Sequence, residues 1–159
     1  MHQRPVATKR AAARLGVWGR RQAHGSCAYS ARASLTVGIR TTAAGVGTRL
    51  GRLSLNREVT ASFLNFSAAG SAHWVAANGD IIYTTVVGQA EFSDLPGGYL
   101  KVTEIHTITG GTSRFTGAEG SFTVELFHKL EASGVTGGVA THDIFGSFHG
   151  TITSPGATR

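Results

Sequence analysis

From about residue 49 onward the chain consists of short β-like runs that are separated by turn-forming residues. The runs are rich in β-branched and aromatic residues, and no segment after residue 49 shows a sustained helical period. A high glycine content, 22 residues against only 3 prolines, is typical of a β-protein with many turns. The pattern predicts an all-β domain over residues 49–156 with about six or seven antiparallel strands. We expect these runs to cover residues 52–66, 71–92, 99–109, 121–130 and 139–153.

The turn chemistry favours hairpins, and hence either a closed barrel or a sandwich. Asn78-Gly79-Asp80 joins two β-rich runs with residues that accept a positive φ. Pro96 and the two glycines after it turn the chain again. Gly88 and Gly146 lie inside expected strands, which favours a barrel, because a strongly coiled strand needs places where it can bend.

Charge divides the chain into two unequal parts. Residues 1–57 contain 11 of the 15 Lys and Arg residues and no acidic residue, whereas residues 58–159 contain the remaining 4 basic residues and all 9 acidic ones. The positive net charge therefore comes from a basic leader and not from the folded part. It gives no ground for specific nucleic-acid binding by the domain.

Residues 1–48 are expected to be a disordered or weakly helical basic leader, with Thr41–Gly51 as the linker into the domain. An Arg-, Ala- and Ser-rich segment without acids is typical of an organelle-targeting peptide, but a basic tail or sequence upstream of the true start fits it as well. The leader has no continuous apolar stretch of the secretory kind, and no run in the chain approaches the length of a transmembrane helix. The sequence thus indicates a soluble protein, either cytoplasmic or organelle-targeted.

The stretch TITGGTSRFTGAEGSFTVE, residues 107–125, has the glycines of a binding loop but not its chemistry. A phosphate-binding loop needs a Gly-Lys-Ser/Thr ending that leads into a helix, and here a strand-like run follows instead. No dinucleotide fingerprint is present, so no cofactor is predicted. We expect a strand–loop–strand unit in which Phe115 is anchored in the core and the glycines form the turns.

The same stretch carries a family resemblance. ITGGTSRFTGAEGSFTVE resembles the glycine-rich segment of dirigent proteins and of allene oxide cyclases, and the chain looks most similar to uncharacterised bacterial members of that barrel type. Ala76–Asp80 and Leu50–Arg52 also resemble segments of those members. Ser113 stands where the family usually has a glycine. The resemblance, over about residues 49–155, implies an eight-stranded antiparallel barrel with a ligand-sized interior, often in a homo-oligomer; it carries over no catalytic residue.

Alternation along the run at residues 99–109 gives the most site-like candidates. Glu104 and His106 share one face with Leu100, Val102 and Ile108. If this face is the interior, the carboxylate and imidazole are candidates for general acid–base catalysis on an apolar substrate. The alternative is a polar pair on the solvent side of a strand whose interior face carries Ile105 and the threonines.

Two further residues are candidates for ligand binding. His128 shares a face with Phe122, Val124 and Leu126 and would point into the same interior, or lie hydrogen-bonded at its mouth. The hydroxyl of Tyr83 would orient a ligand if its face is internal; packing in the core is the alternative.

Metal binding and nucleophilic catalysis have little support in the sequence. His73, His142 and Asp143 are possible metal ligands, but they show no metal-binding spacing, and no metal site is predicted. Cys27 is the single cysteine, so no disulfide forms within the chain.

These observations leave three functional hypotheses. The first is a barrel that binds a small apolar molecule without an assigned reaction. The second is a cyclase or isomerase that uses Glu104 and His106, with Tyr83 and His128 as ligand-binding residues. The third is a structural or oligomer-forming barrel whose interior is filled by its own side chains.

Overall fold

In a computed structural model the chain forms one antiparallel sheet of ten strands, of which eight are at least six residues long. The structure describes residues 11–13, 23–28, 35–47, 50–136 and 139–153. Apart from one 3₁₀ turn, η1 (Ser113–Phe115), the described residues contain no helix, and none of them belongs to a helix that could cross a membrane. The all-β prediction is confirmed. The strands are β1 (Ala11–Ala13), β2 (Ala23–Ala28), β3 (Thr36–Gly47), β4 (Gly51–Ser62), β5 (Ser67–Ala76), β6 (Ile81–Phe92), β7 (Tyr99–Gly111), β8 (Glu119–Lys129), β9 (Gly134–Thr136) and β10 (Val139–Thr153).

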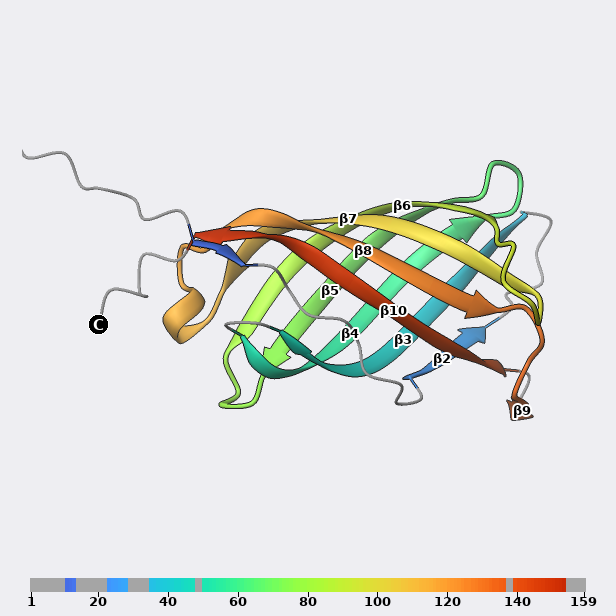
Figure 1. Cartoon of the computed structure of the whole chain (residues 1–159), viewed down its shortest axis with the longest axis horizontal. Coiled ribbons are helices and arrows are strands. Elements are labelled where there is room, and N and C mark those ends of the chain that lie inside the picture. The colour runs from blue at the N-terminus through green and yellow to red at the C-terminus, as the bar shows by residue number, and fades with distance from the viewer. Residues whose placement is uncertain (1–10, 14–22, 29–34, 48–49, 137–138, 154–159) are drawn as a thin grey trace, which may run out of the picture.

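Consecutive strands from β2 to β8 are neighbours in the sheet, as the hairpin-length turns predict. β10 is the exception, since it contacts both ends of this path. Its residues Ile144–Thr153 pair with β8, and its residues Val139–Ile144 pair with β2. In Figure 1 β10 runs diagonally between these two neighbours.

The segment expected to be a linker is mostly strand. Thr36–Gly47 forms β3 and pairs with β4 along its whole length, from Thr36 opposite Ser62 to Gly47 opposite Gly51. The linker prediction for Thr41–Gly51 is therefore wrong over the strand residues of this range. Small residues and threonines make this strand look like a linker, but alternate residues such as Val37 and Thr41 are buried.

Two described parts of the leader are also strands and not helix. Ala11–Ala13 pairs with the end of β10, and Ala23–Ala28 lies between β10 and β3. The rest of residues 1–34 lies outside the described residues, and targeting, a basic tail and an upstream start remain predictions for the leader.

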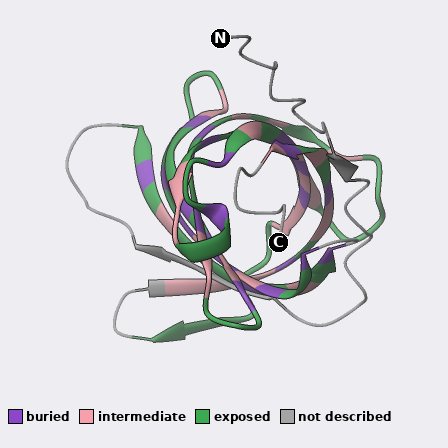
Figure 2. Ribbon diagram, turned by 90° about the vertical axis from the view of Figure 1, so that its left-hand side faces the viewer, coloured by how far each residue is buried: buried purple, intermediate pink, exposed green. Residues whose placement is uncertain are grey.

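Figure 2 shows the sheet curled round on itself. Buried side chains from non-neighbouring strands meet inside it. At one end an aromatic plug fills the interior. Trp74 of β5 lies 4.8 Å from Phe148 of β10 and 5.5 Å from Phe122 of β8, measured between ring centroids. All three side chains are almost completely buried, and each contributes on the order of 2 kcal/mol to folding through removal of apolar surface from water.

The glycine-rich segment is structural, as expected. Phe115 is buried, and Gly111 packs so tightly that an added Cβ would lie 2.6 Å from both the Ile81 carbonyl oxygen and the Phe115 Cβ. Ser113 has a φ of 46°, in the left-handed region that glycine adopts without a steric cost. This explains physically why a glycine suits that position.

Candidate functional site

A polar belt crosses the interior next to the aromatic plug. Arg57 of β4 and Glu104 of β7 are paired by two hydrogen bonds: Arg57 Nε donates to Glu104 Oε2 at 2.9 Å, and Arg57 Nη2 donates to Glu104 Oε1. Arg57 Nη1 also donates to Thr41 Oγ1 of β3 at 2.9 Å. Arg57 is 5% exposed and Glu104 is fully buried, so this is an ion pair in the interior.

His106 extends the belt to two more strands. Its Nε2 lies 3.1 Å from Glu104 Oε2, where the imidazole N–H donates to the carboxylate. Its Nδ1 lies 3.2 Å from the hydroxyl of Thr84 on β6, and that hydroxyl is also 3.2 Å from the Ala72 carbonyl oxygen on β5. The belt consists of Thr41, Arg57, Thr84, Glu104 and His106, and it connects five consecutive strands by hydrogen bonds.

Glu104 is held as a carboxylate. Burial alone raises the pKa of Glu104, but the hydrogen bond from His106 and the charge and hydrogen bonds of Arg57 outweigh burial, so the pKa lies below its ordinary value. Both carboxylate oxygens are occupied by these partners. This arrangement suits the positioning of Arg57 and His106 better than proton transfer by Glu104 itself.

Gly88 makes room for this carboxylate. It lies opposite Glu104 in the pairing of β6 with β7, and a Cβ added to Gly88 would lie 2.8 Å from Glu104 Cγ. The glycine that the sequence associates with strand bending therefore has a specific packing role: it gives Glu104 the space to reach Arg57.

A pocket of about 130 Å³ lies on the other side of the belt from the plug. Along β7 the inward residues run from Ile108 at the plug, through His106 and Glu104, to Val102 and Leu100 at the pocket. Most of the pocket wall is apolar. Its lining residues are Val37, Ile39, Arg57, Ala61, Ser62, Phe63, Phe66, Ser67, Ala68, Ala90, Leu100, Val102, His128, Leu130 and His142.

The connection between β4 and β5 supplies two aromatic walls of the pocket, Phe63 and Phe66. The Asn65 Oδ1 accepts hydrogen bonds from the backbone and the side chain of Ser67, which closes the turn. Phe66 has a φ of 55°, unusual for a residue with a side chain, and the N–H of Ala90 holds its carbonyl oxygen at 2.8 Å. Local hydrogen bonds thus fix a strained turn that places Phe66 at the pocket.

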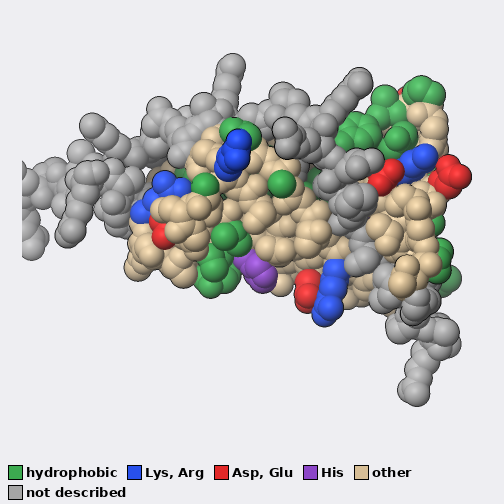
Figure 3. All heavy atoms as spheres, turned by 90° about the horizontal axis from the view of Figure 1, so that it is seen from below, with side chains coloured by type: hydrophobic (Ala, Val, Ile, Leu, Met, Phe, Trp, Pro, Cys, Tyr) green, Lys and Arg blue, Asp and Glu red, His purple; other side chains and the backbone are tan. Residues whose placement is uncertain are grey.

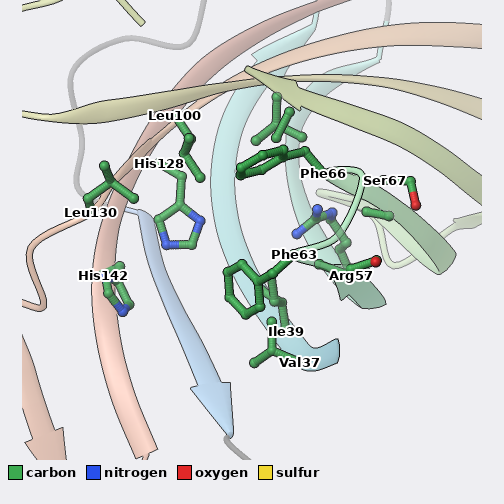
Figure 4. Close-up of a pocket in the computed structure, with 15 residues that line it drawn as sticks. Val37, Ile39, Arg57, Phe63, Phe66, Ser67, Leu100, His128, Leu130 and His142 are labelled. Atoms are coloured by element: carbon green, nitrogen blue, oxygen red, sulfur yellow. The ribbon is translucent and has the colours of Figure 1, made fainter. Parts of the chain in front are cut away.

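Two histidines line the wall opposite Arg57 (Figure 4). The rings of His128 and His142 meet edge to face, with centroids 4.9 Å apart. His142 Nδ1 donates to the Lys129 carbonyl oxygen at 2.9 Å, which leaves Nε2 as the other polar atom of that ring. Burial, followed by the charges of His142 and Arg57, lowers the pKa of His128 to about 4, so His128 is neutral at pH 7.

Exposed apolar side chains surround the pocket end of the sheet. They come from the start of β3, the β4–β5 turn, the end of β6 with the loop that follows, and the end of β8, which strand pairing brings together. Figure 3 shows hydrophobic side chains gathered at one end of the face in view. The rim residues are Leu35, Phe63, Leu64, Phe92, Leu95 and Leu130.

The structure resolves the two readings of residues 99–109. Glu104 and His106 lie inside and are fully buried, while Ile105 is 42% exposed on the outer face. His128 lies at the pocket, as one of its two readings predicts. The roles of these side chains in catalysis or ligand binding stay predictions.

Tyr83 is placed on the outside. It is 41% exposed, and its ring contacts that of His73 with centroids 6.2 Å apart. The inward residues of β6 at this level are Ile82 and Thr84, so the expectation that Tyr83 faces a ligand inside is wrong. Alternation groups residues into two faces, but it does not say which face is internal.

Three belt residues, Thr41, Arg57 and Thr84, are not identified from the sequence. By its sequence, Arg57 is assigned to the basic segment of residues 1–57. In the structure it shares the inward face of β4 with Leu55 and Val59. A single arginine among apolar residues at alternate positions is the signal that could have identified it. Thr41 lies in the supposed linker and has no comparable signal.

The remaining metal-ligand types are dispersed. His73 is on the outer face of β5, His142 is buried on β10, and Asp143, next to His142 in the strand, is directed to the opposite face. Among the described residues there is no group of three or more His, Cys, Asp or Glu side chains that could hold a metal ion.

Comparisons with protein-family models, with curated proteins and with solved structures find no match to this chain.

Proposed function

We propose that this protein is a β-barrel that binds a small apolar molecule in the pocket beside the polar belt. The observation that carries the proposal is a lining in which apolar side chains predominate and a few polar groups, Arg57, His128 and His142, converge from different strands. Apolar pockets with few, well-placed polar groups are the usual form of small-molecule sites. A cavity of about 150 Å³ takes a benzene-sized molecule, and the volume here is similar.

The proposal includes a closed barrel of eight strands. Its support is the strand pairing: β10 pairs with β8 and with β2, and β2 in turn pairs with β3. It also includes kinship with the allene oxide cyclase and dirigent barrels, supported by the glycine-rich segment and by the left-handed backbone at Ser113. We also propose, from the same resemblance, that the protein assembles into a homo-oligomer.

Blocking the pocket tests the binding proposal. Ala90 lines the pocket, and Ala90→Phe would fill it; Val87 is on the same strand but is 58% exposed, so Val87→Phe is the matched control. Toluene is titrated into the labelled protein, and the amide NMR signals of the pocket residues are followed. We expect saturable shifts in the wild type and in Val87→Phe, and none in Ala90→Phe. Failure of toluene to shift the wild-type signals would contradict the proposal.

A cyclase or isomerase is the second candidate, favoured by the buried contact of Glu104 with His106. In such an enzyme His106 would be the proton carrier and Glu104 would orient it, with His128 contacting the substrate. Glu104→Gln distinguishes the candidates once a substrate is known, because loss of turnover with retained binding indicates chemistry. The third candidate is a barrel whose interior is filled by its own side chains. The aromatic plug supports it, but only for the end of the interior that the plug fills.

A further inference from the structure

We propose that the pocket selects an uncharged ring compound with one hydrogen-bond acceptor, such as a ketone or an aldehyde, whose oxygen is bound by Arg57. The inference depends on the proposed binding function and adds the class of ligand. It follows from the donors that Arg57 has left, from the charge balance around it and from the size of the cavity.

Arg57 has hydrogen-bond donors that its partners in the belt do not use. A guanidinium has five N–H groups, and within the described part of the chain the hydrogen bonds of Arg57 to Glu104 and Thr41 use three of them. One N–H on Nη1 and one on Nη2 remain. Arg57 lines the pocket, and Figure 4 shows its guanidinium extending between Phe63 and Phe66 toward the wall with His128. The remaining donors are therefore available to a molecule in the pocket.

The charges of Arg57 and Glu104 at the inner end of the pocket balance each other. Arg57 is the only Lys or Arg among the described residues that line the pocket, and no Asp or Glu is among them. Its charge is already neutralised by Glu104, directly behind it. A carboxylate ligand would thus bring a buried negative charge without a free positive partner, which is strongly unfavourable.

His128 in the pocket wall does not provide the missing positive charge. His128, with a pKa of about 4, carries a proton in only about one molecule in a thousand at pH 7. An anion would have to recruit that proton or go without it. A neutral carbonyl oxygen accepts the N–H of Arg57 at no such cost.

The size and shape of the pocket limit the ligand further. About 130 Å³ suits a single six-membered ring and excludes a long-chain lipid from the pocket itself. Phe63, Phe66 and Leu100 offer apolar contacts to such a ring, with Arg57 at the inner end. The expected ligand has one ring, an apolar edge at the mouth and a carbonyl at the belt.

Three probes of matched size test this inference: acetophenone, isopropylbenzene and benzoate. Isopropylbenzene has a methyl group and a hydrogen in place of the carbonyl oxygen of acetophenone. Benzoate carries a negative charge. Binding to the full chain at pH 7 is measured by NMR titration. We expect acetophenone to bind about tenfold to a hundredfold more tightly than isopropylbenzene, because a hydrogen bond from a charged donor is gained. Benzoate is expected to bind more weakly than acetophenone.

Two variants assign the selectivity to Arg57. Arg57→Lys keeps the positive charge beside Glu104 but loses the planar set of donors. The double variant Arg57→Met with Glu104→Gln removes both charges together, which avoids a buried unpaired carboxylate if the single variant does not fold. In the double variant acetophenone and isopropylbenzene should bind equally, with isopropylbenzene as in the wild type. In Arg57→Lys, whose ammonium keeps N–H donors, the preference for acetophenone should be smaller than in the wild type.

The relative affinities of the three probes test the ligand class separately from the binding function. Equal binding of acetophenone and isopropylbenzene to the wild type would overturn the acceptor inference and leave the apolar pocket standing. Tightest binding of benzoate would overturn it in favour of an anion site. Absence of binding by all three probes would overturn the binding function together with this inference.

Discussion

Arg57 of β4 and Glu104 of β7 hold each other across the interior, although β5 and β6 lie between their strands in the sheet. Such a contact exists only because the sheet is curled. The pair therefore connects the curvature of the sheet to the position of the guanidinium that faces the pocket.

Loss of one partner of this pair should be costly. Arg57→Met leaves Glu104 buried without its cation, and we expect the free energy of unfolding to fall by about 3–5 kcal/mol. The charge-balanced double variant, Arg57→Met with Glu104→Gln, should recover most of that loss. Urea unfolding measures both. Arg40→Met is the control, because Arg40 and Glu58 form an exposed pair at 2.9 Å whose loss should cost less than about 1 kcal/mol. Equal losses for Arg57→Met and Arg40→Met would refute the role of the buried pair.

The space at Gly88 should be indispensable for the belt. Gly88→Ala places a methyl group 2.8 Å from Glu104 Cγ, and we expect a loss of about 1–3 kcal/mol in unfolding free energy. Gly38→Ala is the matched control in β3, because no atom of the described residues lies within 4 Å of its added Cβ. Thermal unfolding of the two variants compares them directly. A Gly88→Ala protein as stable as Gly38→Ala would show that Glu104 does not need this space.

Stability should depend on pH through His128. Its pKa is lowered in the folded protein from 6.5 to about 4, so the unfolded chain takes up the proton first as the pH falls. The stability from this group is fully present above pH 6.5 and is lost as the pH falls toward 4. Between pH 7 and pH 5 we expect a loss of about 2 kcal/mol, measured by urea unfolding at both values.

Two histidine variants separate this effect from other titrations. His128→Gln should lose less stability than the wild type between pH 7 and pH 5. His149→Gln removes an exposed histidine and should follow the wild type. If His128→Gln and the wild type lose the same amount, the titration of His128 is not the cause.

Ser113 should gain from replacement by glycine. Its φ of 46° costs a residue with a Cβ about 1 kcal/mol, so Ser113→Gly should stabilise the protein by up to that amount. Ser121→Gly, in the extended backbone of β8, should instead destabilise it by about 0.5–1 kcal/mol. Opposite signs in thermal unfolding support the left-handed conformation at Ser113, and a loss in both contradicts it.

Much of the fold could be predicted from the sequence because alternation and turn chemistry are local signals. They identify the strands after residue 49 and group Glu104 with His106 on one face. They do not identify β3, because a strand of threonine, alanine and glycine has the composition of a linker until its partner β4 is known. They also leave the inner and outer faces undecided, which is why Tyr83 is misplaced.

The site is less predictable than the fold because its contacts join distant parts of the chain. Arg57 and Glu104 are 47 positions apart, and only the curled sheet brings them together. Their contact depends on the correct register of three strand pairings, β4 with β5, β5 with β6 and β6 with β7. The pocket has the same origin, since its walls come from the ends of several strands that no local pattern relates.

The double pairing of β10 also constrains when the protein can fold. β10 ends at Thr153 and pairs with both β8 and β2, which begins at Ala23, so the sheet contains pairs between residues that are far apart in the sequence. Contacts of such long sequence separation slow folding. During synthesis β2 and β8 each keep one unpaired edge until β10 has left the ribosome. This interval, more than the finished structure, is when the chain is most exposed to aggregation and most in need of a chaperone.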